Sequence, residues 1–156
     1  MVTYHGILAA GAVVLPLDPR DPHRWTAVLG DAAALVTESA LGIPDSAVPP
    51  AHTIVIGADP RGGIAWDEAL RTAGDPGPVA GGDRRAVVLS SSGSAGIPKR
   101  VTVTHHNPVA NLAQIHAIHR IAPGTTVAVV PPLRHIYGMQ TALNPVLRAG
   151  GTLLVI

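Results

Sequence analysis

The stretch LSSSGSAGIPKR, from Leu89 to Arg100, decides how the rest of the sequence is interpreted. It continues the apolar run AVVL, which predicts a buried strand, and it holds two glycines, four clustered serines and one lysine. Glycines let backbone N–H groups approach an anion closely, serine hydroxyls donate hydrogen bonds, and Lys99 supplies a compact positive charge. The stretch therefore predicts a phosphate-binding loop that follows a strand.

This loop differs from the Walker A pattern, which places lysine directly after its second glycine. Here Ile97 and Pro98 separate Gly96 from Lys99, and no Ser or Thr follows the lysine. Taken alone, the segment could also be a Ser/Gly surface turn, because most clusters of these residues are turns.

Apolar runs of strand length alternate with helical patterns along the chain. Strands are predicted at 12–17, 34–39, 53–57, 86–90, 101–104, 126–130 and 152–156, and helices at 23–33, 64–70, from Pro108 onward and at 137–147. Four runs are continuously apolar and are expected to be covered on both faces, at 53–57, 86–90, 126–130 and 152–156. This alternation predicts an α/β fold, with a mostly parallel sheet and helices on both faces.

Asn107 and Pro108 predict the start of the helix that follows the loop. Asn107 would cap the first turn, and Pro108 would occupy the first helical position, where a missing N–H costs nothing. The connection at 74–85 is rich in Gly, Pro and charge, and it is expected to be exposed within one domain over 1–156. We expect that domain to be incomplete, because Met1 leads almost directly into an apolar helix end and Ile156 closes an apolar strand with no polar tail.

The composition excludes several classes of protein. With 156 residues, of which 47% are hydrophobic, the chain can form a hydrophobic core. A formal net charge of +1 and scattered basic residues disfavour a nucleic-acid partner. Cysteine is absent, which excludes disulfides and favours a cytoplasmic location. The longest apolar stretch, at 7–17, is too short for a membrane span and contains Gly11 and Pro16.

The segment SSGSAGIPKR followed by VTVTHHN resembles the signature of the adenylate-forming (AMP-binding) superfamily, TSGTTGxPKG followed by THxN. GILAAGAVVLPLDPRDP resembles the family's earlier GAVVVPLNP region, and PPLRHIYGMQTALNPVLRAGGTLLVI resembles its later PLFHIYG region. The resemblance covers nearly the whole chain, and the HIYG run favours the acyl-CoA synthetase and coumarate-CoA ligase branch. It implies part of the large N-terminal domain of such an enzyme.

The resemblance implies a ligase that uses ATP and Mg²⁺ to activate a carboxylic acid as an acyl-adenylate, with coenzyme A as a possible thiol acceptor. Carried over by position, the ATP phosphate-binding residues are Ser91, Ser92, Gly93, Ser94, Ala95, Gly96 and Lys99, and the acyl-pocket residues are His135, Tyr137 and Gly138. Three positions depart from the family pattern: Ala95 replaces Thr or Ser, Arg100 replaces glycine, and Arg134 replaces an aromatic residue.

Several parts of the family pattern are not found in this sequence, among them the magnesium-binding TE motif, the ribose-binding aspartate and the C-terminal catalytic lysine. No catalytic residue is therefore assigned, and the ligands of Mg²⁺ are expected outside this chain. We expect a fragment that is inactive alone and whose partner is the remainder of the enzyme. Two alternatives stay open: a non-catalytic nucleotide- or partner-binding module that keeps the phosphate loop, and a scaffold whose open sheet edge pairs with another chain.

The histidines have structural alternatives. His135 could be a helix-start residue that bonds nearby backbone. His105, His106, His116 and His119 could suggest a metal site, since the last two lie one helical turn apart. With no Cys or acidic ligand near them, no metal site is predicted.

Overall fold

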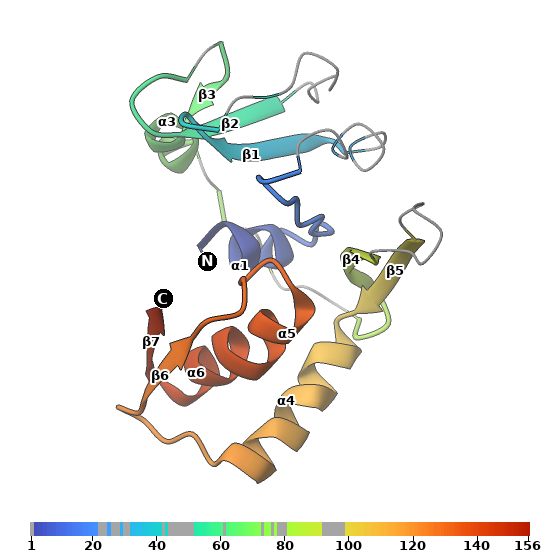
Figure 1. Cartoon of the computed structure of the whole chain (residues 1–156). Helices are drawn as coiled ribbons and strands as arrows, with labels where there is room; N and C mark the ends of the chain where they lie inside the picture. The colour runs from blue at the N-terminus through green and yellow to red at the C-terminus, as the bar shows by residue number, and fades with distance from the viewer. Residues whose placement is uncertain are drawn as a thin grey trace. The chain divides into compact units, whose positions relative to one another are not determined.

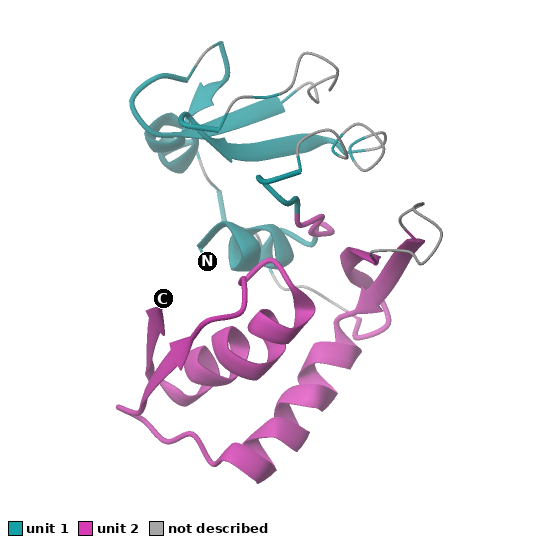
Figure 2. Ribbon diagram, in the orientation of Figure 1, with its two compact units in different colours: residues 1–11, 17–79 teal, residues 12–16, 80–156 magenta. Residues whose placement is uncertain are grey.

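The computed structural model describes residues 2–21, 25, 29, 32–41, 43, 52–60, 62–72, 74–75, 77, 81–91 and 99–156. The chain divides into two compact units, residues 1–11 with 17–79 and residues 12–16 with 80–156 (Figure 2). The last of the three boundaries between the units, at 79–80, falls inside the connection predicted at 74–85.

The first unit contains a parallel sheet in the order β1-β2-β3 (Figure 1). Its elements are α1 (Val2–Ala9), β1 (Ala34–Glu38), β2 (His52–Ile56), β3 (Ile64–Ala65) and α3 (Trp66–Arg71). Buried Trp25, Leu29 and Leu35 form its hydrophobic cluster, and the indole N–H of Trp25 donates to the carbonyl of Asp18 at 2.9 Å. The helix predicted at 23–33 lies mostly outside the described residues.

The second unit contains two two-stranded sheets and two helical segments. Its elements are β4 (Arg85–Ser91), β5 (Lys99–Thr104), α4 (His106–His119), β6 (Thr126–Val129), α5 (Ile136–Gly138), the π-helical turn η2 (Met139–Leu143), α6 (Asn144–Ala149) and β7 (Thr152–Val155). β6 and β7 are parallel, whereas β4 and β5 are antiparallel. Helix α4 contacts β5, η2 and α6, so it joins the hairpin to the helical segment within this unit.

Strand β4 is paired on both sides. Its register with β5 shifts by one residue between Arg85 and Val87, so the ladder is irregular at this point. On the other side, Val14 forms a parallel bridge with Val87: the Val14 N–H donates to Ala86 at 2.8 Å, and the Val88 N–H donates to Val14 at 2.9 Å. The strand predicted at 12–17 is thus reduced to one bridge.

The helical segment from Ile136 to Ala149 widens at η2. The N–H of Asn144 donates to the carbonyl of Met139, five residues earlier, instead of four. Pro145 follows directly and has no N–H, so it cannot continue the regular ladder at this turn. The segment buries Met139 and Val146 almost completely. The helix predicted at 137–147 is confirmed, with a local widening that the sequence analysis did not anticipate.

The α/β architecture with parallel strands is confirmed, and three details of the sequence analysis are corrected. The helix after the loop begins at His106, so Asn107 lies inside its first turn and does not cap it. Ile64 and Ala65 form β3 by pairing with β2, which delays the helix predicted at 64–70 until Trp66.

The third correction concerns the strand predicted at 152–156, which is not covered on both faces. Leu154, Val155 and Ile156 are 53%, 57% and 75% exposed, and β7 pairs with β6 alone among the described strands. Val130, at the end of the predicted strand 126–130, is also exposed. Within the described ranges, no helix has the length and apolar character that a membrane crossing requires.

Candidate functional site

The β4–β5 hairpin carries the two ends of the predicted phosphate loop. Ser91, the last residue of β4, lies directly opposite Lys99, the first residue of β5. The residues between them, which include the predicted site residues Ser92, Gly93, Ser94, Ala95 and Gly96, lie outside the described residues. The structure thus brings together the serine and the lysine that bound the loop.

The register of the hairpin decides which side chains share a face. Residues directly opposite in an antiparallel pair project to the same face, and neighbours along a strand alternate. Lys99 therefore shares a face with Ser91, and with Leu89 and Val101, which form the next pair on that face. Arg100, opposite Ser90, belongs to the other face, so it does not lie beside Lys99.

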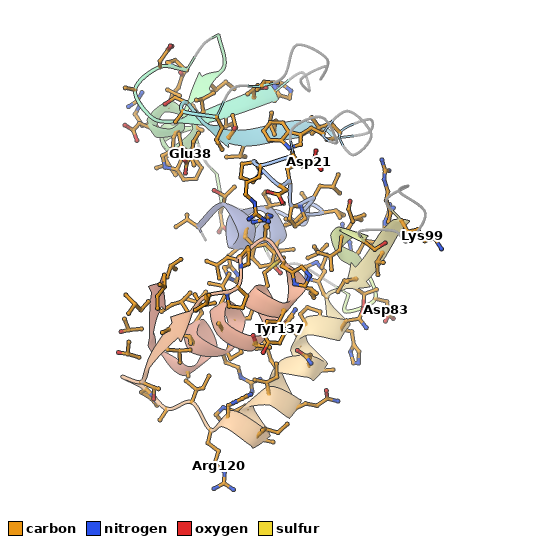
Figure 3. The ribbon with its side chains drawn as sticks, viewed as in Figure 1. Asp21, Glu38, Asp83, Lys99, Arg120 and Tyr137 are labelled. Carbon is orange, nitrogen blue, oxygen red and sulfur yellow. The ribbon has the colours of Figure 1, made fainter. Side chains whose placement is uncertain are left out.

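Lys99 is placed to meet an anion. Its side chain is exposed at the outer end of β5, as Figure 3 shows, and no carboxylate in the described ranges forms an ion pair with its ammonium group. An ammonium group that is not paired with a carboxylate can donate charge-assisted hydrogen bonds to phosphate oxygens. Lys99 is also the sole lysine of the sequence.

The predicted acyl-pocket residues occupy the start of the helical segment in the same unit. His135 precedes α5 in an extended conformation, and its Nδ1 accepts a hydrogen bond from the Tyr137 N–H at 3.2 Å. His135 is thus a helix cap, as its structural alternative predicted, while its ring stays exposed. Tyr137, labelled in Figure 3, is 59% exposed. Both side chains are accessible to a ligand.

Gly138 is buried, and the backbone carbonyls of Pro131 and Pro132 lie so close to it that no side chain would fit. A Cβ at this position would lie 2.6 Å from the carbonyl oxygen of Pro132 and 3.0 Å from that of Pro131. The same turn is held by a hydrogen bond from the His135 N–H to Pro132 at 3.0 Å. Gly138 therefore supports the neighbouring side chains by close packing and does not itself reach outward.

Two buried amides that the sequence analysis did not single out lie further along the same helical segment. Gln140 and Asn144 are 8% and 7% exposed, and the Asn144 amide donates to Gln140 at 3.4 Å. The Asn144 Oδ1 has no hydrogen-bond partner among the described residues. Gln140 and Asn144 are four residues apart in an apolar segment, and this spacing could have predicted that the two amides lie next to each other on one helix face.

The histidines and carboxylates do not assemble into a metal centre in the described ranges. No three His, Asp or Glu side chains there are grouped closely enough to share a metal ion. His116 and His119 lie in the last turn of α4, and both are exposed. The described residues therefore do not fit a magnesium site, and no chemical step is assigned to a metal held by them.

The chain belongs to the AMP-binding enzyme family, whose model matches it over residues 1–156. The chain is 32% identical over 169 aligned residues to 4-coumarate–CoA ligase-like 9 of Oryza sativa subsp. japonica. That alignment covers 96% of the chain and 29% of the rice protein.

Solved structures share the fold. A protein of Rhodopseudomonas palustris described as a long-chain fatty-acid–CoA ligase superposes with a TM-score of 0.82 at 18% identity, covering 97% of this chain and 40% of that one. MatB from Rhodopseudomonas palustris, solved with ATP bound, superposes with a TM-score of 0.76 at 23% identity, covering 99% of this chain and 32% of that one. The chain thus spans a minor part of the length of these relatives.

Proposed function

We propose that the chain is part of an ATP-dependent ligase that activates a carboxylic acid as an acyl-adenylate and passes the acyl group to a thiol, with coenzyme A as the acceptor. The observation that carries the proposal is the position of Lys99 opposite Ser91, at the two ends of the segment that resembles the family's phosphate loop. Membership of the AMP-binding enzyme family over the whole chain supports it. The absence of cysteine supports a cytoplasmic location.

In this proposal the hairpin binds the β- and γ-phosphates of ATP through Ser91, Lys99 and the loop residues between them. A carboxylate oxygen of the substrate attacks the α-phosphorus and forms the acyl-adenylate, while the bond to pyrophosphate breaks. Charge that accumulates on the departing pyrophosphate is stabilised by the Lys99 ammonium, which is in place before the reaction.

The acyl substrate is assigned to the face that carries His135 and Tyr137. The Nδ1 of His135 accepts from the Tyr137 N–H, so its ring orientation is fixed and its Nε2 edge is available to a substrate. Gly138 holds this face in place by packing against Pro132. The exposed Tyr137 ring offers both an apolar surface and a hydroxyl.

Titration of the chain with ATP tests the phosphate site. Lys99→Ala should weaken ATP binding about 10- to 100-fold, because a charge-assisted hydrogen bond is lost. Arg148→Ala, which removes an equal charge from the exposed end of α6, is the matched control and should leave the affinity unchanged. Equal affinities of the parent and Lys99→Ala would refute the site.

Chemical modification gives a second readout, because Lys99 is the sole lysine of the chain. An amine-reactive acylating reagent should modify Lys99, and ATP should protect it, as peptide mass spectrometry can measure. Modification at the same rate with and without ATP would place the nucleotide elsewhere.

Carboxylate-dependent exchange of labelled pyrophosphate into ATP tests the chemistry. We propose that this chain alone exchanges poorly, since it spans 29% of the rice relative and the remainder of the enzyme supplies the other groups. Adding a polypeptide that corresponds to the rest of the relative's length should raise the rate. ATP binding without exchange in that mixture would favour the non-catalytic module instead, and rapid exchange by the chain alone would contradict the need for the remainder.

A further inference from the structure

A cluster of hydrogen bonds closes the base of the β4–β5 hairpin, at the end away from Ser91 and Lys99. The Asn107 Oδ1 accepts from the N–H of Thr104 at 2.8 Å and from its hydroxyl at 3.0 Å. The His105 N–H donates to Arg84 at 3.0 Å, and the His106 N–H donates to Gly82 at 2.7 Å. The first turn of α4 is thereby tied to the end of β5 and to the chain entering β4.

The Asn107 side chain therefore does not cap helix α4 but binds the end of β5. The side chain reaches back three residues along the chain and satisfies two donors on the last residue of β5. Thr104 is the residue of β5 that pairs with Arg85, just before the register shift at Val87. Asn107 thus holds Thr104 at the end of β5, next to the two backbone hydrogen bonds that tie His105 and His106 to the chain entering β4.

Register matters here because it sets the face on which Lys99 projects. A slip of one residue moves every side chain of a strand to the opposite face. Tight two-residue turns fix the register of ordinary hairpins, but seven residues separate Ser91 from Lys99. The hydrogen bonds at the base of the hairpin constrain the other end of the same ladder.

We propose that Asn107 is a positioning residue for the phosphate site: by anchoring Thr104 it fixes the register of β5 on β4 and so keeps Lys99 opposite Ser91. It acts through β5, whose five residue steps span about 17 Å, and does not touch the nucleotide. The proposal rests on the proposed ATP site for its consequence, but the register itself is independent of any ligand.

Disulfide trapping measures the register directly, because the parent chain has no cysteine. Leu89→Cys combined with Val101→Cys joins residues that lie directly opposite and should cross-link readily under mild oxidation. Leu89→Cys combined with Arg100→Cys or Thr102→Cys reports a slip by one residue in either direction. In the Asn107→Ala background, the in-register cross-link should fall and an off-register cross-link should rise.

Asn107→Asp keeps the acceptor oxygen and should retain the parent cross-linking pattern. Asn111→Ala, an asparagine one turn further along the same helix, is the matched control and should also retain it. ATP titration of the same variants should give about a tenfold weaker affinity for Asn107→Ala and a parent-like affinity for the other two. Thr104→Val, which removes one of the two donors and keeps a β-branched residue, should show the same changes to a smaller extent if Asn107→Ala does not fold.

Unchanged in-register cross-linking in Asn107→Ala and Thr104→Val would overturn the proposal and leave Asn107 a purely structural residue. Loss of register in Asn107→Ala with no ATP binding by the parent chain would support the role of Asn107 in fixing the β4–β5 register and refute the proposed ATP site. The two failures are therefore distinguishable.

Discussion

Substituting Gly138 by Ala tests the close packing that holds the HIYG turn. The new Cβ would lie 2.6 Å from the Pro132 carbonyl oxygen and 3.0 Å from that of Pro131, and both are backbone atoms that cannot rotate away. Overpacking of this kind costs about 1 to 3 kcal/mol, and backbone contacts place Gly138→Ala at the upper end of that range. The higher helix propensity of Ala returns about 1 kcal/mol. The expected net loss is about 2 kcal/mol, or a factor of about 30 in the folding equilibrium.

Gly6→Ala is the matched control, because Gly6 lies in helix α1 and a Cβ there would meet nothing within 4 Å. It should stabilise the chain by about 0.5 to 1 kcal/mol. Urea unfolding should be followed by circular dichroism, since both tryptophans, Trp25 and Trp66, belong to the first unit and their fluorescence does not report on Gly138. If Gly138→Ala were as stable as the parent, or more stable like Gly6→Ala, the argument from the close contact between Gly138 and the Pro132 carbonyl would be refuted.

Three further predictions each concern a substitution at one residue. Gly57→Ala should destabilise the folded chain by about 2 kcal/mol, because Gly57 has a φ of +126° and a Cβ would collide with the Ser39 hydroxyl. If Ser39→Ala restored the parent stability to Gly57→Ala, the collision alone would explain the loss and the positive φ would contribute nothing. His135→Ala should cost about 1 kcal/mol through loss of the cap. His135→Asn should restore stability but not pyrophosphate exchange in the mixture with the remainder of the enzyme. Recovery of both would make the histidine purely structural. Burial lowers the pKa of His5 in the folded chain. As the pH drops below about 6.5, the unfolded chain therefore binds a proton at His5 more readily than the folded chain, and the free energy of unfolding should fall. Urea titrations at several pH values should show this dependence in the parent and not in His5→Leu.

The sequence predicted the elements whose signal is local. The apolar runs at 34–39, 53–57 and 86–90 became strands β1, β2 and β4. Burial was predicted less well, because it depends on what packs against an element. The runs at 126–130 and 152–156 are as apolar as those of covered strands, yet Val130 and Leu154 are exposed.

The features that position the site are tertiary and left weak local signals. The close contact between Gly138 and Pro132 depends on how a turn folds back, and nothing in the spacing of HIYG indicates a distance. Asn107 next to Pro108 matches the usual start of a helix, but its amide has a better partner in Thr104. The widening at Met139–Leu143 had a local cue in Pro145, whose missing N–H disturbs a helix in more than one way.

The exposed strand β7 has a consequence for the chain in solution. Its sequence TLLVI combines strong β-propensity with high hydrophobicity and carries no charge and no proline, which is the composition of segments that assemble into stacked cross-β aggregates. Its outer edge offers unpaired backbone groups to any neighbouring chain, since β7 pairs with β6 alone among the described strands. We therefore expect β7 to promote association of this polypeptide at high concentration, and we expect a charged residue in place of the exposed Leu154 to reduce it.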